Sequence, residues 1–326
     1  PPDPAMVERH SAVDAEREAR TLAGTAPMQL VYCSCSAAGR SIHSRLPVPT
    51  PYSVSPSANP SGESPFRHSL TFDSCFESGN LLSAVQRGES EYDLFLRADL
   101  HTTGFTQWFY FAVSNTHPKG HNGTTRATFR ICNLTKPDSL FNQGMRPVCY
   151  SMIDAQARGT GWVRTGYDIF YRQNLYRRGG TGSGGEEVEK SKPAGQGGAN
   201  HYTLSFTVDF HNPGDTVLIA HSYPFTHSDC KRHTASLLTH PKRKQYVRRS
   251  VLCQSLGGHD VDLLTITDFS KAAGGVQYAY PSPCEGGAED EGGGGSSSTN
   301  GYANGDSRKR TIVFTGRVHP GETPAP

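Results

Sequence analysis

Short apolar segments with strand character alternate with turn residues through the middle of this chain. In residues 202–210 every second position is apolar, from Tyr202 to Phe210, which is typical of a strand with one buried face. Similar segments, rich in aromatic and β-branched residues and separated by Gly, Asn, Pro and Asp, are 69–76, 91–99, 107–114, 126–133, 161–164, 168–172 and 216–223. Short strands at such spacing predict an antiparallel β-sandwich.

The pattern changes after residue 225. Ser228 or Asp229 can cap a helix that continues through Leu237 and Leu238 and stops near Pro241. Strand-like segments follow at 250–256, 261–267 and 311–318. We therefore expect a sandwich domain at residues 66–225 and the start of an α/β domain at 226–326, with a mixed sheet and flanking helices.

Three segments contain too little apolar surface to form a core. Residues 1–65 form a Pro/Ser-rich leader that we expect to be disordered. Residues 177–199 and 270–309 are glycine-rich, and we expect flexible insertions, one in each domain.

Composition excludes several classes of protein. No apolar run approaches the roughly 18 residues of a membrane span, and the polar start lacks a secretory core, so we expect no membrane association. The eight cysteines are scattered through 326 residues, which favours a reducing, cytosolic setting. The net charge of +2 gives no sign of nucleic-acid binding, and the aromatic run 108–111 lacks interleaved Lys or Arg. Burial in the sandwich explains that run better.

His319 and Glu322 are the strongest candidates for chemistry. An imidazole and a carboxylate three positions apart can bind one zinc ion, and the strand-like segment 311–318 would place them in the turn at its carboxyl end. Pro320 and Gly321 would end the strand and fold the backbone tightly there. The spacing alone is also explained by a polar turn.

Other polar groups permit two interpretations each. His227, Cys230 and His233 could bind a second metal, but the first turn of a capped helix explains them too. His259 and Asp262 match a metal-ligand spacing, yet they flank a Gly-Gly turn that favours a hairpin.

The stretch 226–250 carries seven Lys/Arg against Asp229. It is explained by a solvated helix end and loop, by a nuclear-import signal at 241–244, or by a docking surface for glutamate-rich tails.

Eight segments in order resemble the cytosolic carboxypeptidases, from about residue 68 to 326. They are FESGNL, EYDLFLRAD, QWFYFAVSN, ICNLTKPDSLFNQGMRP, GWVRTG, YPFTHSD, DLLTIT and TGRVHPGETP. FDSCFESGNL, EYDLFLR and the proline after HPGET resemble most the branch of cytosolic carboxypeptidase 6. The family consists of zinc metallocarboxypeptidases with a β-rich domain ahead of an α/β catalytic domain.

The resemblance implies a hydrolase that removes glutamate from acidic protein tails, chiefly tubulin, in the cytoplasm and at microtubules. It implies one Zn²⁺ bound by His319 and Glu322, which polarises a water for attack on the peptide bond. The family's second histidine ligand, substrate-binding arginine and general-base glutamate match no residue of this sequence, so no catalytic or substrate-binding residue is assigned. We expect the chain as given to be inactive. The alternative is a non-catalytic β-sandwich module that binds a protein partner and carries a vestigial peptidase segment.

Overall fold

The computed structural model describes residues 4–34, 64–99, 102, 106–177, 200–271 and 312–316. The chain divides into two compact units, the first running to Asp229 and the second from Cys230 to Thr315. Residues 178–199 and 272–311, which hold most of the predicted glycine-rich insertions, lie outside the described residues.

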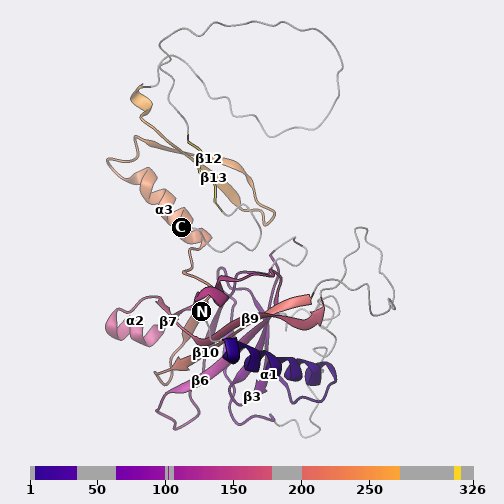
Figure 1. Cartoon of the computed structure of the whole chain (residues 1–326). Helices are drawn as coiled ribbons and strands as arrows, with labels where there is room; N and C mark the ends of the chain where they lie inside the picture. Colours follow the sequence, from indigo (N-terminus) through magenta and orange to yellow (C-terminus); the bar gives the residue numbers. More distant parts are fainter. Residues whose placement is uncertain are drawn as a thin grey trace, which may run out of the picture. The chain divides into compact units, whose positions relative to one another are not determined.

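The first unit is a sandwich of two sheets (Figure 1). The larger sheet has six strands, in the order β1 (Gln29–Cys33), β3 (Leu81–Gly88), β4 (Glu91–Leu96), β6 (Thr125–Leu134), β10 (Asn200–Phe210) and β9 (Tyr167–Arg177). The smaller sheet has five, in the order β2 (Thr71–Asp73), β5 (Tyr110–Ser114), β11 (Val217–Ala220), β7 (Val148–Ser151) and β8 (Val163–Arg164). Neighbouring strands are antiparallel except β4 and β6, which are parallel. The predicted β-sandwich is confirmed.

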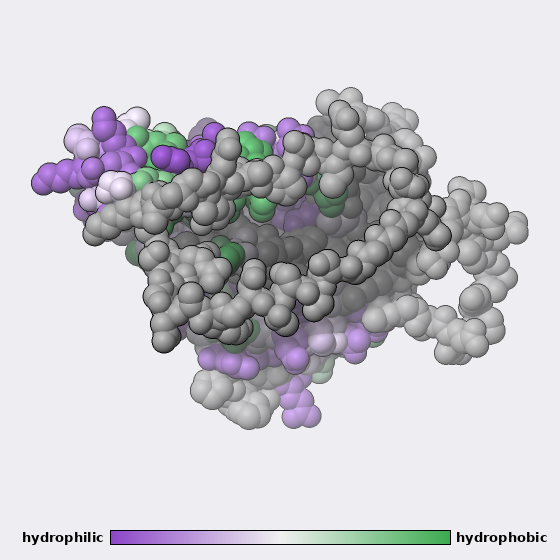
Figure 2. Space-filling model, turned by 90° about the horizontal axis from the view of Figure 1, so that it is seen from above, coloured by the Kyte–Doolittle hydropathy of each residue, from purple (hydrophilic) through white to green (hydrophobic). Residues whose placement is uncertain are grey.

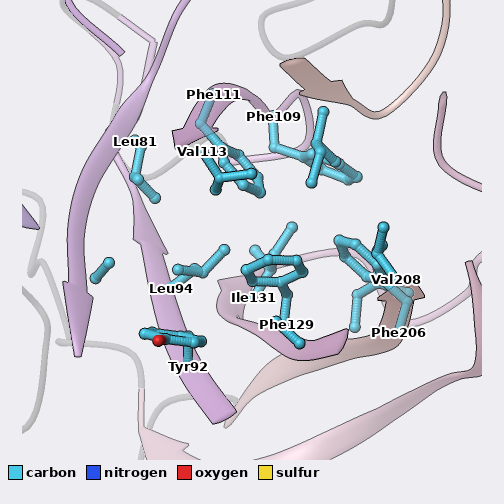
Figure 3. Packing of buried hydrophobic residues seen from close by; sticks show 14 of the residues in the cluster. Leu81, Tyr92, Leu94, Phe109, Phe111, Val113, Phe129, Ile131, Phe206 and Val208 are labelled. Carbon is cyan, nitrogen blue, oxygen red and sulfur yellow. The ribbon is translucent and has the colours of Figure 1, made fainter. Parts of the chain in front are cut away.

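The core lies between the two sheets. Figure 3 shows Phe109, Phe111 and Val113, at and before β5, facing Phe129 and other side chains of the larger sheet. Phe109 and Phe206 stack at 6.1 Å between ring centroids. The alternating residues of 202–210 contribute to this core, as predicted, and so does the aromatic run 108–111, in which Phe109 and Phe111 are fully buried.

Two short helices lie between strands of the sandwich in the sequence. The 3-10 helix η2 (Leu140–Gln143) and helix α2 (Met152–Arg158) begin at Ser139 and Ser151, whose hydroxyls accept backbone N–H groups, and end at glycines with positive φ.

The predicted disorder of residues 1–65 is wrong for its first half. Residues Pro4–Leu22 form helix α1, which lies on the outer face of the six-stranded sheet, and Gln29–Cys33 form strand β1 at its edge (Figure 1). The low apolar content of this segment did not indicate a packed helix, because α1 contacts the sheet through charged side chains. Residues 35–63 lie outside the described residues.

The described part of the second unit consists of a helix, a two-stranded hairpin and a 3-10 turn. Helix α3 (His227–Thr239) starts in the last residues of the first unit, and β12 (Val247–Gln254) pairs antiparallel with β13 (Asp260–Ile266). A 3-10 turn, η3 (Phe269–Lys271), follows. The hairpin exposes three apolar residues, Val251, Leu252 and Ile266. Figure 2 shows hydrophobic and hydrophilic residues mixed on the described surface.

Candidate functional site

The predicted zinc ligands, His319 and Glu322, lie outside the described residues. The segment that leads to them is described at 312–316 and is not a strand there. Ile312 and Val313 are each 77% exposed, and Phe314 is 90% exposed. The predicted buried strand at 311–318 is therefore wrong for 312–316. An apolar run becomes a buried strand only where neighbours pair with its edges and cover its faces, and 312–316 joins none of the sheets formed by the described residues.

Among the residues that the structure describes, His, Cys, Asp and Glu form no group of three or more that could hold a metal ion. His227, Cys230 and His233 lie in the first turns of α3. The Thr226 hydroxyl accepts the Asp229 N–H at 3.1 Å, and the Asp229 carboxylate accepts the Thr226 N–H at 2.9 Å. This reciprocal cap supports the interpretation of the segment as a helix start.

His259 and Asp262 belong to a hairpin, as the Gly-Gly turn indicates. The Asp262 carboxylate accepts hydrogen bonds from Arg249 at 2.7 Å and from Lys231 at 3.0 Å. The hydrogen bond from Arg249, more than any other interaction, lowers the pKa of Asp262. Lys231 therefore ties α3 to the hairpin, and Arg249 joins the two strands of the hairpin.

The basic stretch 226–250 divides into structural and exposed cations. Lys231 and Arg249 pair with Asp262, and the Arg248 guanidinium lies 4.0 Å from the centre of the Phe269 ring. Lys242, Arg243 and Lys244 occupy an exposed turn after α3 and make no ion pair within the described part of the chain. We name these three cations the basic turn, residues 242–244.

Several of the segments that carry the family resemblance converge on one loop of the sandwich. In the segment 76–81, Asn80 donates to the Trp108 carbonyl at 2.6 Å and accepts the Tyr110 N–H at 3.2 Å. The Trp108 indole donates to the Ser78 carbonyl at 2.9 Å. A Cβ on Gly79 would overlap the carbonyl oxygen of Ser74, so only glycine fits there. The loop is therefore fixed by the start of β5 and by Trp108, which precedes it.

Glu77 connects this loop to the start of α3. Its carboxylate accepts the backbone N–H of Ser228 at 2.8 Å, and this hydrogen bond lowers the pKa of Glu77. Carboxylates are favoured at a helix N-terminus because unpaired N–H groups point outward there. The motif residue Glu77 thus has a positioning role at the end of the first unit.

His221 is a buried titratable group behind the same loop. Its ring packs against Phe109 and Phe141, at 5.5 and 5.2 Å between centroids, and its Nδ1 has no hydrogen-bond partner in the described structure. Burial lowers its pKa to about 4, and the charges of Arg164 and Lys136 act in the same direction. His221 is therefore neutral at pH 7 and serves packing.

Sequence reasoning missed a network of buried charges on the outer face of the six-stranded sheet. Asp93 accepts hydrogen bonds from Arg87 Nε at 2.9 Å and from Arg130 Nε at 2.8 Å. Burial alone would raise the pKa of Asp93, but Arg130 and Arg87 outweigh it and lower the pKa. The available signal was the charge at every second position of apolar strands, as at Glu91 and Asp93.

Comparison with known proteins supports the family resemblance. Residues 72–172 match the family described as cytosolic carboxypeptidase N-terminal domain. Cytosolic carboxypeptidase 2 of Xenopus tropicalis is 38% identical over 254 residues, which is 78% of this chain and 21% of that protein. Cytosolic carboxypeptidase 1 of Danio rerio is 36% identical over 256 residues, 78% of this chain and 19% of that protein. The chain thus spans about a fifth of the length of these relatives.

The predicted resemblance to the branch of cytosolic carboxypeptidase 6 is corrected, because the relatives found are members 1, 2 and 3. A run as short as FDSCFESGNL cannot separate members of one family, whereas alignment over some 250 residues can.

A crystal structure of a putative carboxypeptidase A from Shewanella denitrificans OS-217 is 18% identical, covers 61% of this chain and 40% of that one, and has a TM-score of 0.37. That score is too low to support a conclusion. No helix in the described ranges is long and apolar enough to cross a membrane.

Proposed function

We propose that this chain is part of a zinc metallocarboxypeptidase that removes glutamates from acidic protein tails, such as those of tubulin. Residues 72–172 support this, because they match the family described as cytosolic carboxypeptidase N-terminal domain. The observation that carries the proposal is the ordered match of 254 residues to a cytosolic carboxypeptidase. In this proposal the sandwich domain comprises residues 66–225 together with α1 and β1, and residues 226–326 belong to the peptidase domain.

His319 and Glu322 are the zinc ligands in this proposal. Imidazole nitrogen and carboxylate oxygen are the donors of a catalytic zinc site, which keeps a position open for water. The bound metal would lower the pKa of that water and polarise the scissile carbonyl. Glycine at 321 and proline at 320 suit the tight turn that two ligands three positions apart require.

Zinc binding tests this assignment directly. Equilibrium dialysis of the 326-residue chain is expected to show one zinc ion bound weakly, because two side chains form only part of a site. His319→Ala and Glu322→Gln are each expected to abolish this binding. His121→Ala, an exposed histidine of the sandwich, is the matched control and is expected to bind zinc as the wild type does. Zinc binding that survives both ligand substitutions would refute the assignment.

The basic turn at Lys242, Arg243 and Lys244 supports an acidic substrate. These exposed cations make no ion pair in the described part of the chain, whereas Lys231 and Arg249 pair with Asp262. Replacing all three by Ser is expected to weaken binding of a polyglutamylated tubulin-tail peptide about tenfold at low salt, and less at high salt. The matched control replaces three exposed cations of the sandwich, Lys119, Arg126 and Arg158, by Ser. Equal loss in both triple variants would show that only net charge matters.

A further inference from the structure

Helix α1 docks through its polar side. Among the α1 side chains that the structure describes, those of residues 8, 9 and 11–22, the buried ones are Asp14, Glu18 and Thr21. They fall on one stripe, with 6%, 6% and 0% of their surface exposed. The apolar residues Val13 and Leu22 are 56% and 42% exposed. A helix held by apolar burial shows the opposite arrangement. Charged contacts are therefore what fixes α1 to the sheet.

Glu18 occupies a receptor for a carboxylate. Its Oε1 accepts Arg172 Nη2 at 2.5 Å, and its Oε2 accepts the backbone N–H of Leu175 at 3.1 Å. A guanidinium and a fixed backbone N–H, converging on the two oxygens of one carboxylate, recognise both its charge and its shape. Arg172 and Leu175 both lie on β9, which belongs to the rigid sheet.

Asp14, one helical turn before Glu18, reaches the same place. Its Oδ2 accepts the Ser205 hydroxyl at 3.4 Å and lies 3.7 Å from Arg172 Nη2. The surface made by Arg172, Leu175 N–H and Ser205, which we name the carboxylate receptor, thus binds two acidic side chains four positions apart. This spacing matches acidic residues on one face of a helix.

The receptor stays positive when α1 is set aside. Under α1 the sheet carries three arginines, Arg87, Arg130 and Arg172, against the carboxylates of Glu91 and Asp93. Arg87 and Arg130 share Asp93, whereas both acidic partners of Arg172 in the described structure, Asp14 and Glu18, belong to α1. The Arg172 Nε is also buried with no hydrogen-bond partner in the described structure.

The contacts of Glu18 are opposed by the cost of burying its carboxylate. Burial raises the pKa of Glu18, and Arg172 and the Leu175 N–H offset only part of this, while the carboxylate of Asp14 adds to it. Burial therefore offsets part of what the contacts of Glu18 contribute to the docking of α1.

We propose that α1 is a detachable plug in the carboxylate receptor, and that an acidic segment of a partner protein, with two carboxylates one helical turn apart, displaces it. Charge complementarity and the two seated carboxylates of α1 define this occupant. The proposal does not depend on the zinc site, and its failure would leave the zinc assignment intact.

Charge reversal on α1 in the 326-residue chain tests the plug. Glu18→Lys places an ammonium against Arg172 and is expected to release α1, and Glu16→Lys makes the same change at an exposed position of the helix. Trypsin is expected to cleave after Arg17 and Arg20 at least about tenfold faster in Glu18→Lys than in Glu16→Lys. Sodium chloride is expected to speed this cleavage in the wild type. Equal cleavage of the two variants would overturn the plug.

Peptide binding tests the receptor. The probe is a labelled helical peptide with two glutamates four positions apart, and its glutamine counterpart is the control peptide. Glu18→Lys is expected to bind the glutamate peptide at least about tenfold tighter than the wild type, because no helix competes. Adding Arg172→Gln to Glu18→Lys is expected to abolish binding, with circular dichroism showing an intact sandwich. Equal binding of both peptides, or binding that survives Arg172→Gln, would overturn the proposal.

Discussion

Strand β6 buries its two faces by different means. Phe129 and Ile131 point into the sandwich among other apolar side chains, whereas Arg130 points to the opposite face and pairs with Asp93. All of these residues are buried, with at most 5% of their surface exposed. The comparison teaches that burial alone does not tell what stabilises a position. The inner face depends on filled volume, and the outer face depends on balanced charge.

The inner face gives the largest expected loss. Phe129→Ala removes a ring that packs against Phe72, Phe111 and Phe206, and it should lower the free energy of unfolding by about 3–5 kcal/mol. Urea denaturation followed by circular dichroism measures this. Leu140→Ala, at a position that is 61% exposed, is the control and should change stability by less than about 0.5 kcal/mol. Similar losses in the two variants would contradict the role given to packing.

The outer face should respond to unbalanced charge. Asp93→Asn leaves Arg87 and Arg130 buried without their shared carboxylate, and it should lower the free energy of unfolding by about 3 kcal/mol. The triple variant Arg87→Met, Asp93→Leu, Arg130→Met removes all three charges and should recover most of that loss. A triple variant less stable than Asp93→Asn would show that the ion pairs themselves contribute more than their desolvation costs.

His221 places a titratable group among apolar rings, so it sharpens the comparison through pH. Its pKa is about 4 in the folded protein and about 6.5 when unfolded, so the unfolded state binds the proton first. The wild type should therefore lose about 3 kcal/mol of stability as the pH falls from above 6.5 to 4. His221→Phe should flatten this part of the profile. Urea unfolding at several pH values measures it, and a profile as steep as that of the wild type would exclude His221 as the cause.

Glu18 gives the smallest expected effect. Because burial raises its pKa, any stability linked to it is fully present at low pH and is lost as the pH rises through the folded pKa. Glu18→Gln, which imitates the protonated side chain, should thus change stability at pH 7 by no more than about 1 kcal/mol in either direction. A loss as large as that expected for Asp93→Asn would mean that the two carboxylates on this face contribute alike. Thermal unfolding of the wild type and of Glu18→Gln at pH 5 and pH 7 measures the stability change and its dependence on pH.

The sequence predicted those parts of the fold that follow from local pattern. Alternation from Tyr202 to Phe210 identified an inward face, and the Gly-Gly turn before His259 identified a hairpin. Helix α1 could not be found this way, since its buried positions are Asp14, Glu18 and Thr21, which read as a solvated face until their partners on β9 and β10 are known. Strand β3 was missed because its residues are buried on both faces and its pairing contains irregularities, which remove the alternation.

The candidate site depended less on the fold than on sequence resemblance. The strand predicted before His319 fails at 312–316, since Phe314 is exposed and the strand tendency of an apolar run is realised only beside a partner strand. Glu77 was quoted only as part of a motif, and its role at the start of α3 emerged from a single hydrogen bond to Ser228. Such contacts join residues 151 positions apart and leave no local signature in the sequence.

The parallel pairing of β4 with β6 has a consequence for how the chain folds. Between these two strands the chain leaves the larger sheet to form β5 in the smaller one, so the seam can close only after that excursion is made. Asp93 and Arg130 are direct partners across this seam. A shift of the pairing register by one residue would turn the Asp93 carboxylate toward the phenylalanines of the interior. Burial of that unpaired charge would raise the free energy of the mispaired form. The ion pair therefore favours the native register between β4 and β6.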